Sequence, residues 1–272
     1  LIEVAWCNSN CTEPHGVAKR LPNALGLYDM TGNVAEWCWD IYDEFYYEYS
    51  TDNNPLGPES RISQDGVIKG GSYKKSLKIS NRDFFTMKGR FPEIGFRIVQ
   101  STEKRVWNDP TPDEKVADKV EAFLKNGPSM NLVKSQINYT NRIVGGETVP
   151  VDVPFYLGRY EVSQYEWKAI MGNNPSKFSY NLENPVEGVD YYDCLYFCNK
   201  LSERFGYIPC YEIDGNINAD QWDFRTVKEN TKSSKVTCNF KANGFRLPTE
   251  EEYKALGVGG EYTDGVNKGW TY

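Results

Sequence analysis

The sequence predicts an α+β fold with short strands, few helices and much loop. Short apolar runs rich in β-branched and aromatic residues are bounded by Gly, Asn and Pro, which is typical of short strands between turns. A few amphipathic segments begin with capping boxes, which mark helix N-termini. The 19 Tyr and 7 Trp among 272 residues favour a loop-rich fold whose amphipathic rings are half buried.

Composition excludes several classes of function. The net charge is −7 with dispersed Lys and Arg, so no basic face indicates a nucleic-acid partner. No apolar run approaches the length that spans a bilayer, and the first residues lack the regions of a signal peptide. We therefore expect this chain to be soluble and not to insert directly into a membrane, with any export signal or lipid anchor lying outside it.

The N-terminal part predicts turns followed by one strand. After the Gly32-Asn33 turn, residues 34–40 alternate large apolar and polar side chains, which indicates a strand with one buried face. Asp29, Asn33 and Glu36 could supply oxygens to a hard cation such as Ca²⁺. Alternatively, these oxygens only cap the turn. Residues 41–60, rich in Tyr, Asp, Glu and Pro, predict a surface loop.

The segment from Gly70 to Arg97 has defined ends and a mixed middle. A strand at 66–69 leads into Gly70-Gly71, where the backbone can turn sharply. The end, 94–99, is β-prone, and Arg97 could hold a carboxylate in a bidentate fork. The middle mixes cations with apolar side chains and suits a surface loop that contacts a ligand. By composition alone, a solvated connection with its aromatics folded onto the core is the favoured alternative.

A connector separates two bodies of sequence. Residues 111–114, Thr-Pro-Asp-Glu, form a capping box with Pro at the first helical position, and the helix carries Val116, Val120, Phe123 and Leu124 on one face. Asn126-Gly127-Pro128 ends it.

The C-terminal body predicts a strand at 155–162 and three helices. Ser163 with Glu166 opens a helix that ends at Gly172. Asp190 caps a longer helix that ends at Gly206, and the third helix begins at Thr249 with Glu252 in the reciprocal position.

Seven Cys without a Cys-x-x-Cys pair and one His form no zinc constellation. Cys194 and Cys198, four apart on a helix, are expected to pack as small apolar groups. Cys210 and Cys238 are expected to be close in space, as a disulfide if the protein is exported. His15 is the single imidazole available to a nucleophilic triad, and a facial iron triad needs two. Composition and spacing therefore predict no enzyme.

Several ordered motifs resemble the formylglycine-generating enzyme (sulfatase-modifying factor) family. Residues 155–164, 171–176, 184–186 and 244–253 are similar to its N-terminal half. Residues 23–37, 70–73 and 95–97 are similar to its C-terminal half. The resemblance implies an irregular, C-type-lectin-like α+β domain.

The family halves stand in permuted order. Residues 1–100 match the C-terminal half, 101–129 form the connector, and 130–272 match the N-terminal half. We expect the two halves to form one complete domain, because half domains would leave buried faces bare. Three explanations of the permuted order stay open: the chain is a circular permutant, it is numbered from fragments, or it is cut from a tandem array and holds two half domains.

The resemblance implies a member without catalysis. The family's enzymes carry two cysteines after the Gly-Gly-Ser-aromatic motif, and here Lys75 and Ser80 occupy those positions. The His residues that hold iron in relatives that make sulfur bonds are lacking too. The family's Ca²⁺ lies near the segment that matches Asp29, Gly32, Val34 and Glu36, so a structural Ca²⁺ is possible here and no other cofactor is required.

A second branch of the fold resembles the sequence more closely: the variable proteins of diversity-generating retroelements, which include a surface protein of oral spirochaetes. In that branch the segment between the two glycine motifs is diversified and binds ligand. The resemblance implies a non-catalytic binding protein for a protein or other macromolecule, at the bacterial cell surface or in the periplasm. A structural scaffold in an envelope or motility assembly is the alternative, and a metal-dependent oxidoreductase is the third. Ligand identity and oligomeric state stay open. The implied contact residues are Tyr73, Lys74, Lys75, Leu77, Lys78, Ser80, Asn81, Asp83, Phe84, Phe85, Lys88, Arg90 and Phe91.

Overall fold

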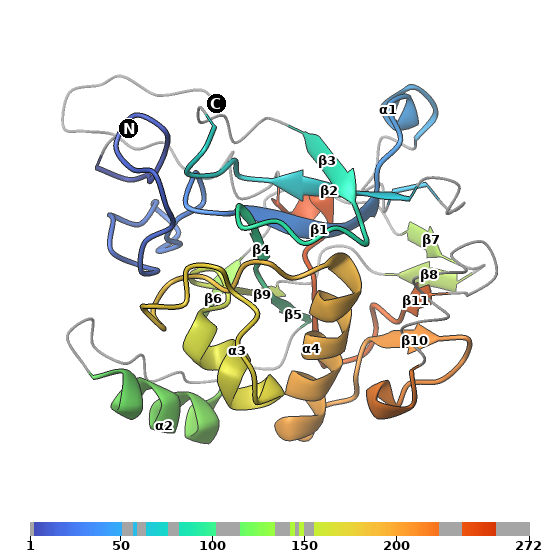
Figure 1. Ribbon diagram of the computed structural model, residues 1–272. Helices are drawn as coiled ribbons and strands as arrows, with labels where there is room; N and C mark the ends of the chain where they lie inside the picture. The colour runs from blue at the N-terminus through green and yellow to red at the C-terminus, as the bar shows by residue number, and fades with distance from the viewer. Residues whose placement is uncertain are drawn as a thin grey trace.

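Two four-stranded sheets lie at the centre of the computed structural model (Figure 1). The structure describes residues 3–50, 57–58, 64–75, 82–101, 115–133, 142–144, 147–149, 155–222 and 236–253. In spatial order the first sheet contains β3 (Asp83–Thr86), β2 (Asp65–Lys69), β1 (Ala35–Ile41) and β4 (Ile94–Phe96). The second contains β12 (Phe245–Arg246), β5 (Val99–Ser101), β9 (Phe155–Gly158) and β6 (Met130–Val133).

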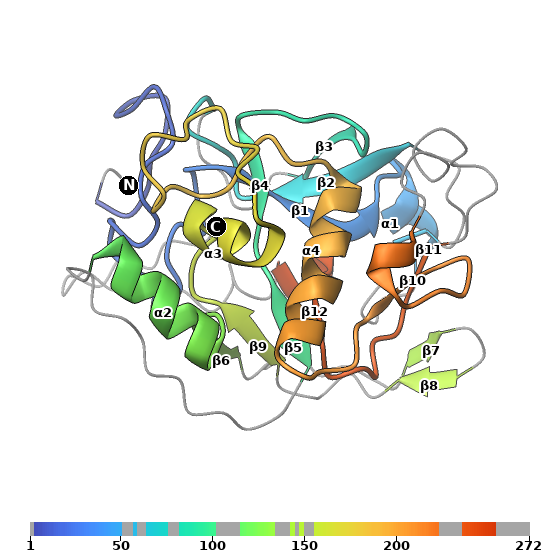
Figure 2. The same ribbon diagram turned by 60° about the horizontal axis from the view of Figure 1, so that its bottom comes forward.

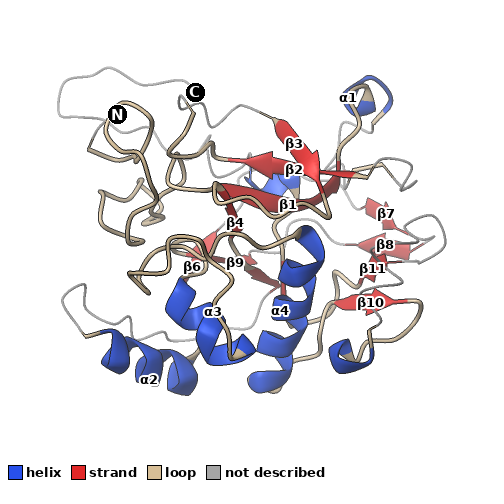
Figure 3. Cartoon of the chain, viewed as in Figure 1, coloured by secondary structure: helices blue, strands red, loops and turns tan. Residues whose placement is uncertain are grey.

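Pairing in the first sheet is mixed, whereas the second is antiparallel throughout. β1 runs antiparallel to β2 and parallel to β4, and its register with β2 shifts between Trp37 and Ile41. Two small antiparallel pairs lie outside these sheets: β7 (Arg142–Val144) with β8 (Glu147–Val149), and β10 (Tyr211–Ile213) with β11 (Val236–Cys238). Figure 3 shows how much of the trace is loop, as the sequence predicts.

The helices of the C-terminal body begin where the capping signals predict. In α3 (Gln164–Met171), the Ser163 side chain and Glu166 complete a capping box, and Gly172 ends the helix in the left-handed conformation. Asp190 and Asp193 form a second box at the start of α4 (Tyr191–Arg204). Thr249 and Glu252 exchange the same bonds at the start of the helical turn 250–253.

The connector helix differs from its prediction. α2 (Val116–Asn126) begins four residues beyond the predicted Pro112, because Lys115 is extended and serves as the N-cap without a side-chain bond. The predicted capping box at 111–114 lies outside the described residues. The helix packs its apolar face on the core, since Phe123 is buried with its ring edge-on to Phe205. Figure 2 shows α2 beside α3.

The predicted surface loop at 41–60 contains a short helix, α1 (Tyr46–Tyr49). Tyr46 is its buried residue, while Tyr47 and Tyr49 are exposed and pack edge-on to it. A 3₁₀ turn, η1 (Ala219–Gln221), follows β10, with the Asn218 side chain as its cap.

The core joins the segments on both sides of the connector. The Trp167 and Phe197 rings stack at 5.2 Å, and both pack edge-on against Phe96. β5 lies between β9 and β12, so strands from before and after the connector share one sheet. The permuted order of the family halves stays a prediction.

Candidate ligand-binding surface

The start of the segment from Gly70 to Arg97 is fixed by close backbone contacts. Gly70 and Gly71 both have positive φ, at 85° and 72°. A Cβ on Gly70 would lie 2.5 Å from the Tyr253 hydroxyl oxygen, so the position has no room for a side chain. The Gly70 carbonyl accepts from the Gly32 N–H at 2.9 Å, which ties this turn to the earlier one.

The end of the segment is fixed by a buried ion pair. Arg97 and Glu36 are both fully buried, and the guanidinium donates to the carboxylate through Nε at 3.0 Å and Nη2 at 2.9 Å. It also donates to the carbonyls of Gly158 and Tyr28. Burial alone would lower the pKa of Arg97, but Glu36 outweighs it and raises that pKa. The bidentate role predicted for Arg97 is confirmed.

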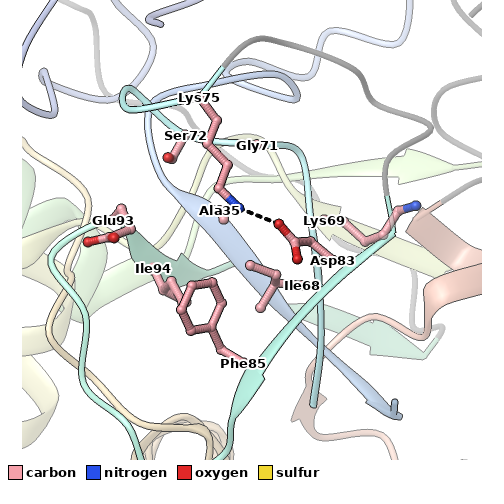
Figure 4. A pocket seen from close by; sticks show the side chains of 10 residues that line it. All are labelled: Ala35, Ile68, Lys69, Gly71, Ser72, Lys75, Asp83, Phe85, Glu93 and Ile94. Atoms are coloured by element: carbon pink, nitrogen blue, oxygen red, sulfur yellow. Dashed lines mark hydrogen bonds and ion pairs between the residues drawn. The ribbon is translucent and has the colours of Figure 1, made fainter. Parts of the chain in front are cut away.

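A small hollow of about 30 Å³ lies between these two ends (Figure 4). The Lys75 ammonium reaches down from the turn and pairs with Asp83 of β3 at 2.5 Å. Lys69 lines the hollow with its stem, while its nitrogen points away. The hollow therefore suits one protruding group of a larger ligand. Its lining comprises Ala35, Ile68, Lys69, Gly71, Ser72, Lys75, Asp83, Phe85, Glu93 and Ile94.

β3 divides the predicted contact residues between two faces. Asp83 and Phe85 line the hollow, whereas Phe84 is 43% exposed and stacks on Tyr42 at 4.1 Å. This division follows from the period of two along a strand, which sends neighbouring side chains to opposite faces. The nine predicted residues that the structure describes therefore do not form one continuous surface.

Most predicted cationic contacts are already paired within the chain. Lys74 pairs with Glu93 at 3.0 Å. Arg90 reaches the α4 N-terminus, at 3.4 Å from Asp190 and 2.7 Å from Asp193. In contrast, Lys88 has no ion pair within the described ranges, and it is partly exposed. A ligand would have to compete for the paired side chains.

Tyr73 does not lie where the prediction put it. Its side chain is 2% exposed, because the ring packs edge-on to Phe178 inside the protein. Burial raises its pKa to about 12. Tyr73 thus supports the surface from beneath. Phe91 is partly buried with its ring 4.6 Å from that of Phe85. Leu77, Lys78, Ser80 and Asn81 lie outside the described residues.

A buried carboxylate cluster surrounds the predicted calcium segment. Asp29 accepts from the Ala18 N–H through Oδ2, but its Oδ1 has no partner within the described ranges. Both carboxylate oxygens of Glu161 are also buried without a partner there. Burial raises the pKa of Asp29 to about 6 and that of Glu161 well above its ordinary value. Sequence reasoning missed Glu161, although an acid within the predicted apolar strand at 155–162 could have indicated it.

The unpartnered oxygens of Asp29 and Glu161 fit a hard cation, which takes oxygen ligands. Glu36 fits less well, because both of its oxygens already accept from Arg97. Gly32 and Val34 could contribute only backbone carbonyls. No group of three or more His, Cys, Asp or Glu is arranged as a metal site in the part of the chain that the structure describes.

His15 and the helix cysteines have structural surroundings. The His15 ring packs edge-on to Trp6 at 3.9 Å, and its backbone exchanges hydrogen bonds with Asn33. Cys194 and Cys198 are fully buried in the core, as predicted.

Cys210 and Cys238 lie on neighbouring segments of the β10–β11 pair, where Cys238 is opposite Tyr211 and Asn239 donates to the Cys210 carbonyl. Both thiols are free in this structure. The disulfide that we expect on export stays a prediction.

None of the helices that the structure describes is both long enough and apolar enough to cross a bilayer.

One family model matches both parts of the sequence. Residues 4–102 and 121–270 match the family model of the sulfatase-modifying factor enzyme 1-like domain. Chaperone protein LppX of Paenibacillus barcinonensis is 41% identical over 39% of this chain and 37% of its own length. The formylglycine-generating enzyme of Streptomyces coelicolor is 42% identical over 30% of this chain and 27% of its own length. Treponema denticola variable protein 1, a solved structure, is 35% identical over 35% of each chain with a TM-score of 0.32.

The chain thus spans between about a quarter and little more than a third of the length of these relatives. The family match nevertheless covers both segments on either side of the connector. The chain has the irregular α+β architecture, with short strands and few helices, of the predicted C-type-lectin-like fold. The chain belongs to the sulfatase-modifying factor enzyme 1-like family.

Proposed function

We propose that this chain is a non-catalytic, ligand-binding member of its family. The ligand contacts the hollow between the glycine turn and Arg97, and the protein is exported and displayed on a bacterial surface. One observation carries the proposal. Where the family's enzymes have the first cysteine, Lys75 forms an ion pair with Asp83 above an apolar floor that includes Phe85 and Ile94.

The chemistry of this hollow favours binding over catalysis. Its lining contains no thiol and no imidazole, so it lacks the groups that the family's enzymes use at this place. It offers both signs of charge and an aromatic ring, which suits polar and apolar contacts with a macromolecule. Since the hollow is small, we expect only one small protruding group of the ligand to enter it.

A paired assay tests both halves of the proposal. The chain is incubated with copper, oxygen and a peptide that carries a sulfatase-type cysteine, and the aldehyde is measured by mass spectrometry. We expect no conversion. In parallel, protein and glycan arrays are probed with the wild type, a Lys75→Ala/Asp83→Ala variant and a Lys200→Ala control, whose ion pair to Asp220 lies elsewhere. Aldehyde formation, or an array signal that the double variant retains in full, would overturn the proposal.

The variability of the gene supplies a second test. If the segment is a diversified display surface, residues 74–91 should vary between strains far more than the two ends at 70–73 and 95–97. Equal variability inside and outside the segment would contradict a diversified display surface. Ligand binding itself would still be tested by the arrays.

The alternative is a structural scaffold in an envelope or motility assembly. Lys74 and Arg90 each form an ion pair with a carboxylate of the same chain, and this favours the scaffold. Side chains held in this way are less available to a ligand. The name of one relative, chaperone protein LppX, agrees with a role in assembly. The scaffold predicts invariant residues at 74–91 and a stable partner that copurifies from native membranes.

We further propose a structural Ca²⁺ at the buried carboxylates, with Asp29 and Glu161 as its side-chain ligands and the backbone near Gly32 and Val34 beside it. Calcium should then raise the melting temperature of the wild type and leave that of a Glu161→Gln variant unchanged. An identical response of the two proteins would contradict this site. Stoichiometric iron or copper in the purified protein would instead revive the third alternative, an oxidoreductase.

A further inference from the structure

An exposed aromatic surface lies on the side of β3 that faces away from the hollow. We define it by Tyr42, Phe45, Tyr47, Tyr49 and Phe84. Four of these side chains are 42–60% exposed, namely Phe45, Tyr47, Tyr49 and Phe84. Large aromatic side chains gathered in this way on one face are typical of an interaction site.

Four of the five rings of the aromatic surface, all but Phe45, are held in place by contacts that the structure describes. Tyr42 stacks on Phe84 at 4.1 Å with 25° between the rings. The Tyr47 hydroxyl is hydrogen-bonded to Glu251 at 3.2 Å, and the Tyr49 hydroxyl to Asp43 at 2.5 Å. Because these four rings are already ordered, binding of a partner would cost little conformational entropy for them.

The aromatic surface already holds one guanidinium of its own chain. Arg82 lies between two rings, 4.5 Å from the centre of Tyr42 and 5.2 Å from that of Tyr47. It donates to the Glu250 carboxylate at 2.8 Å and to the Asp43 carbonyl at 2.8 Å. This site shows which chemistry the aromatic surface accepts: a planar cation between tyrosines with a carboxylate at its edge.

Further cation-binding groups on the aromatic surface stay exposed. Residues 42–49 contain three acids, Asp43, Glu44 and Glu48, and no Lys or Arg. Glu44 and Glu48 are exposed, and neither forms an ion pair within the described ranges. Glu44 directly precedes Phe45 and Glu48 directly precedes Tyr49 in the sequence, so each of these exposed rings has a carboxylate beside it along the chain.

From this juxtaposition we propose that the aromatic surface docks an Arg- or Lys-rich peptide segment of another protein. The partner's cations bind over Phe45 and Tyr49 as Arg82 binds between Tyr42 and Tyr47, while Glu44 and Glu48 supply the opposite charge. A neutral glycan could also stack on exposed rings, but the three carboxylates favour a cationic partner. The proposal does not depend on a ligand in the hollow.

The test measures anisotropy of a fluorescein-labelled peptide of alternating Arg and Gly, added to the full chain at low and high salt. Phe45→Leu and Tyr49→Leu keep apolar side chains but remove the ring faces. Each should weaken binding by roughly two- to fivefold, the range expected for one exposed cation–π contact. Glu44→Gln/Glu48→Gln should flatten the salt dependence, because fewer charges meet the peptide.

Two controls separate this surface from the rest of the protein. Tyr180→Leu removes a tyrosine that is 65% exposed on another element, and Lys75→Ala/Asp83→Ala alters the hollow; both should bind the peptide like the wild type. Binding that Phe45→Leu and Tyr49→Leu leave unchanged would overturn the proposal, as would equal weakening by Tyr180→Leu. A neutral oligosaccharide that binds where the peptide does not would overturn it in favour of a glycan.

Discussion

The ends of the segment from Gly70 to Arg97 and its middle use charge in opposite ways. At the end, Arg97 and Glu36 are fully buried, and each satisfies the other. In the middle, Lys75 and Asp83 pair in the open, with side chains 56% and 41% exposed. A buried ion pair fixes a geometry because either partner alone would be left as a desolvated charge. An exposed pair fixes little, so its residues can change without changing the fold.

The largest effect should follow from breaking the buried pair. Arg97→Met leaves Glu36, Asp29 and Glu161 without a buried cation, and we expect a loss of about 3–5 kcal/mol in the free energy of unfolding. Urea denaturation measures it. The double variant Arg97→Met/Glu36→Gln should recover part of the loss, because the uncompensated carboxylate is gone. A loss below about 1 kcal/mol would show that the stability of the fold does not depend on this ion pair.

Buried acids should also make stability depend on pH. Burial, with the Glu250 charge, raises the pKa of Asp40 to about 7, against 3.8 as the ordinary value. The folded state therefore binds this proton more tightly than the unfolded state. Protonated Asp40 therefore stabilises the folded state relative to ionised Asp40. This contribution to the free energy of unfolding is complete below about pH 4 and is lost as the pH rises through 7.

When the pH is raised from 5 to 8, the free energy of unfolding of the wild type should therefore fall by on the order of 3 kcal/mol more than that of an Asp40→Asn variant. Urea denaturation at both pH values checks this. Asp220→Asn, at an exposed acid, should keep the wild-type slope. A slope that Asp40→Asn does not change would mean that Asp40 stays ionised in the folded protein.

A smaller effect is expected at the glycine that begins the segment. Gly70→Ala places a Cβ 2.5 Å from the Tyr253 hydroxyl at a φ of 85°, and we expect a loss of about 2–3 kcal/mol. Gly172→Ala is the matched control, since its φ is 76° with nothing within 4 Å. It should lose about 1 kcal/mol from backbone strain alone. Equal losses at the two glycines would show that the contact with Tyr253 yields easily.

The smallest effect should come from the exposed pair. Lys75→Ala or Asp83→Ala should change the free energy of unfolding by less than about 1 kcal/mol. Thermal denaturation beside the Arg97→Met variant provides the comparison. A loss as large as that of Arg97→Met would mean that the Lys75–Asp83 pair is needed for the stability of the fold.

Features set by neighbouring residues could be predicted from the sequence. The capping boxes at Ser163 and Thr249 need only side chains three residues apart, so local spacing determined them. The glycine turn and the bidentate role of Arg97 were also predictable. The start of α2 was not, because Lys115 takes an extended conformation despite a good capping signal upstream. Propensity is a weak prior there, and packing on the core determines which residues are helical.

The candidate site was predicted in composition but not in geometry. Tyr73 is the aromatic residue of the motif at 70–73, and its ring packs against Phe178, which is more than a hundred residues away in the sequence. Glu161 lies near Asp29 only in the folded chain. The two residues are too far apart in the sequence for motif spacing to predict their proximity. The two faces of β3 were within reach, since Asp83, Phe84 and Phe85 alternate with a period of two. A strand expected there would have separated the hollow from the aromatic surface.

The place of β5 between β9 and β12 also bears on how the chain is held together. Its two neighbours come from after the connector, and the described part of that connector adds α2 but no strand to the sheet before β6. The hydrogen bonds and the aromatic core join the two segments directly. The peptide chain between them is a tether that raises their effective concentration, so a single cut in the tether should leave two fragments bound to each other.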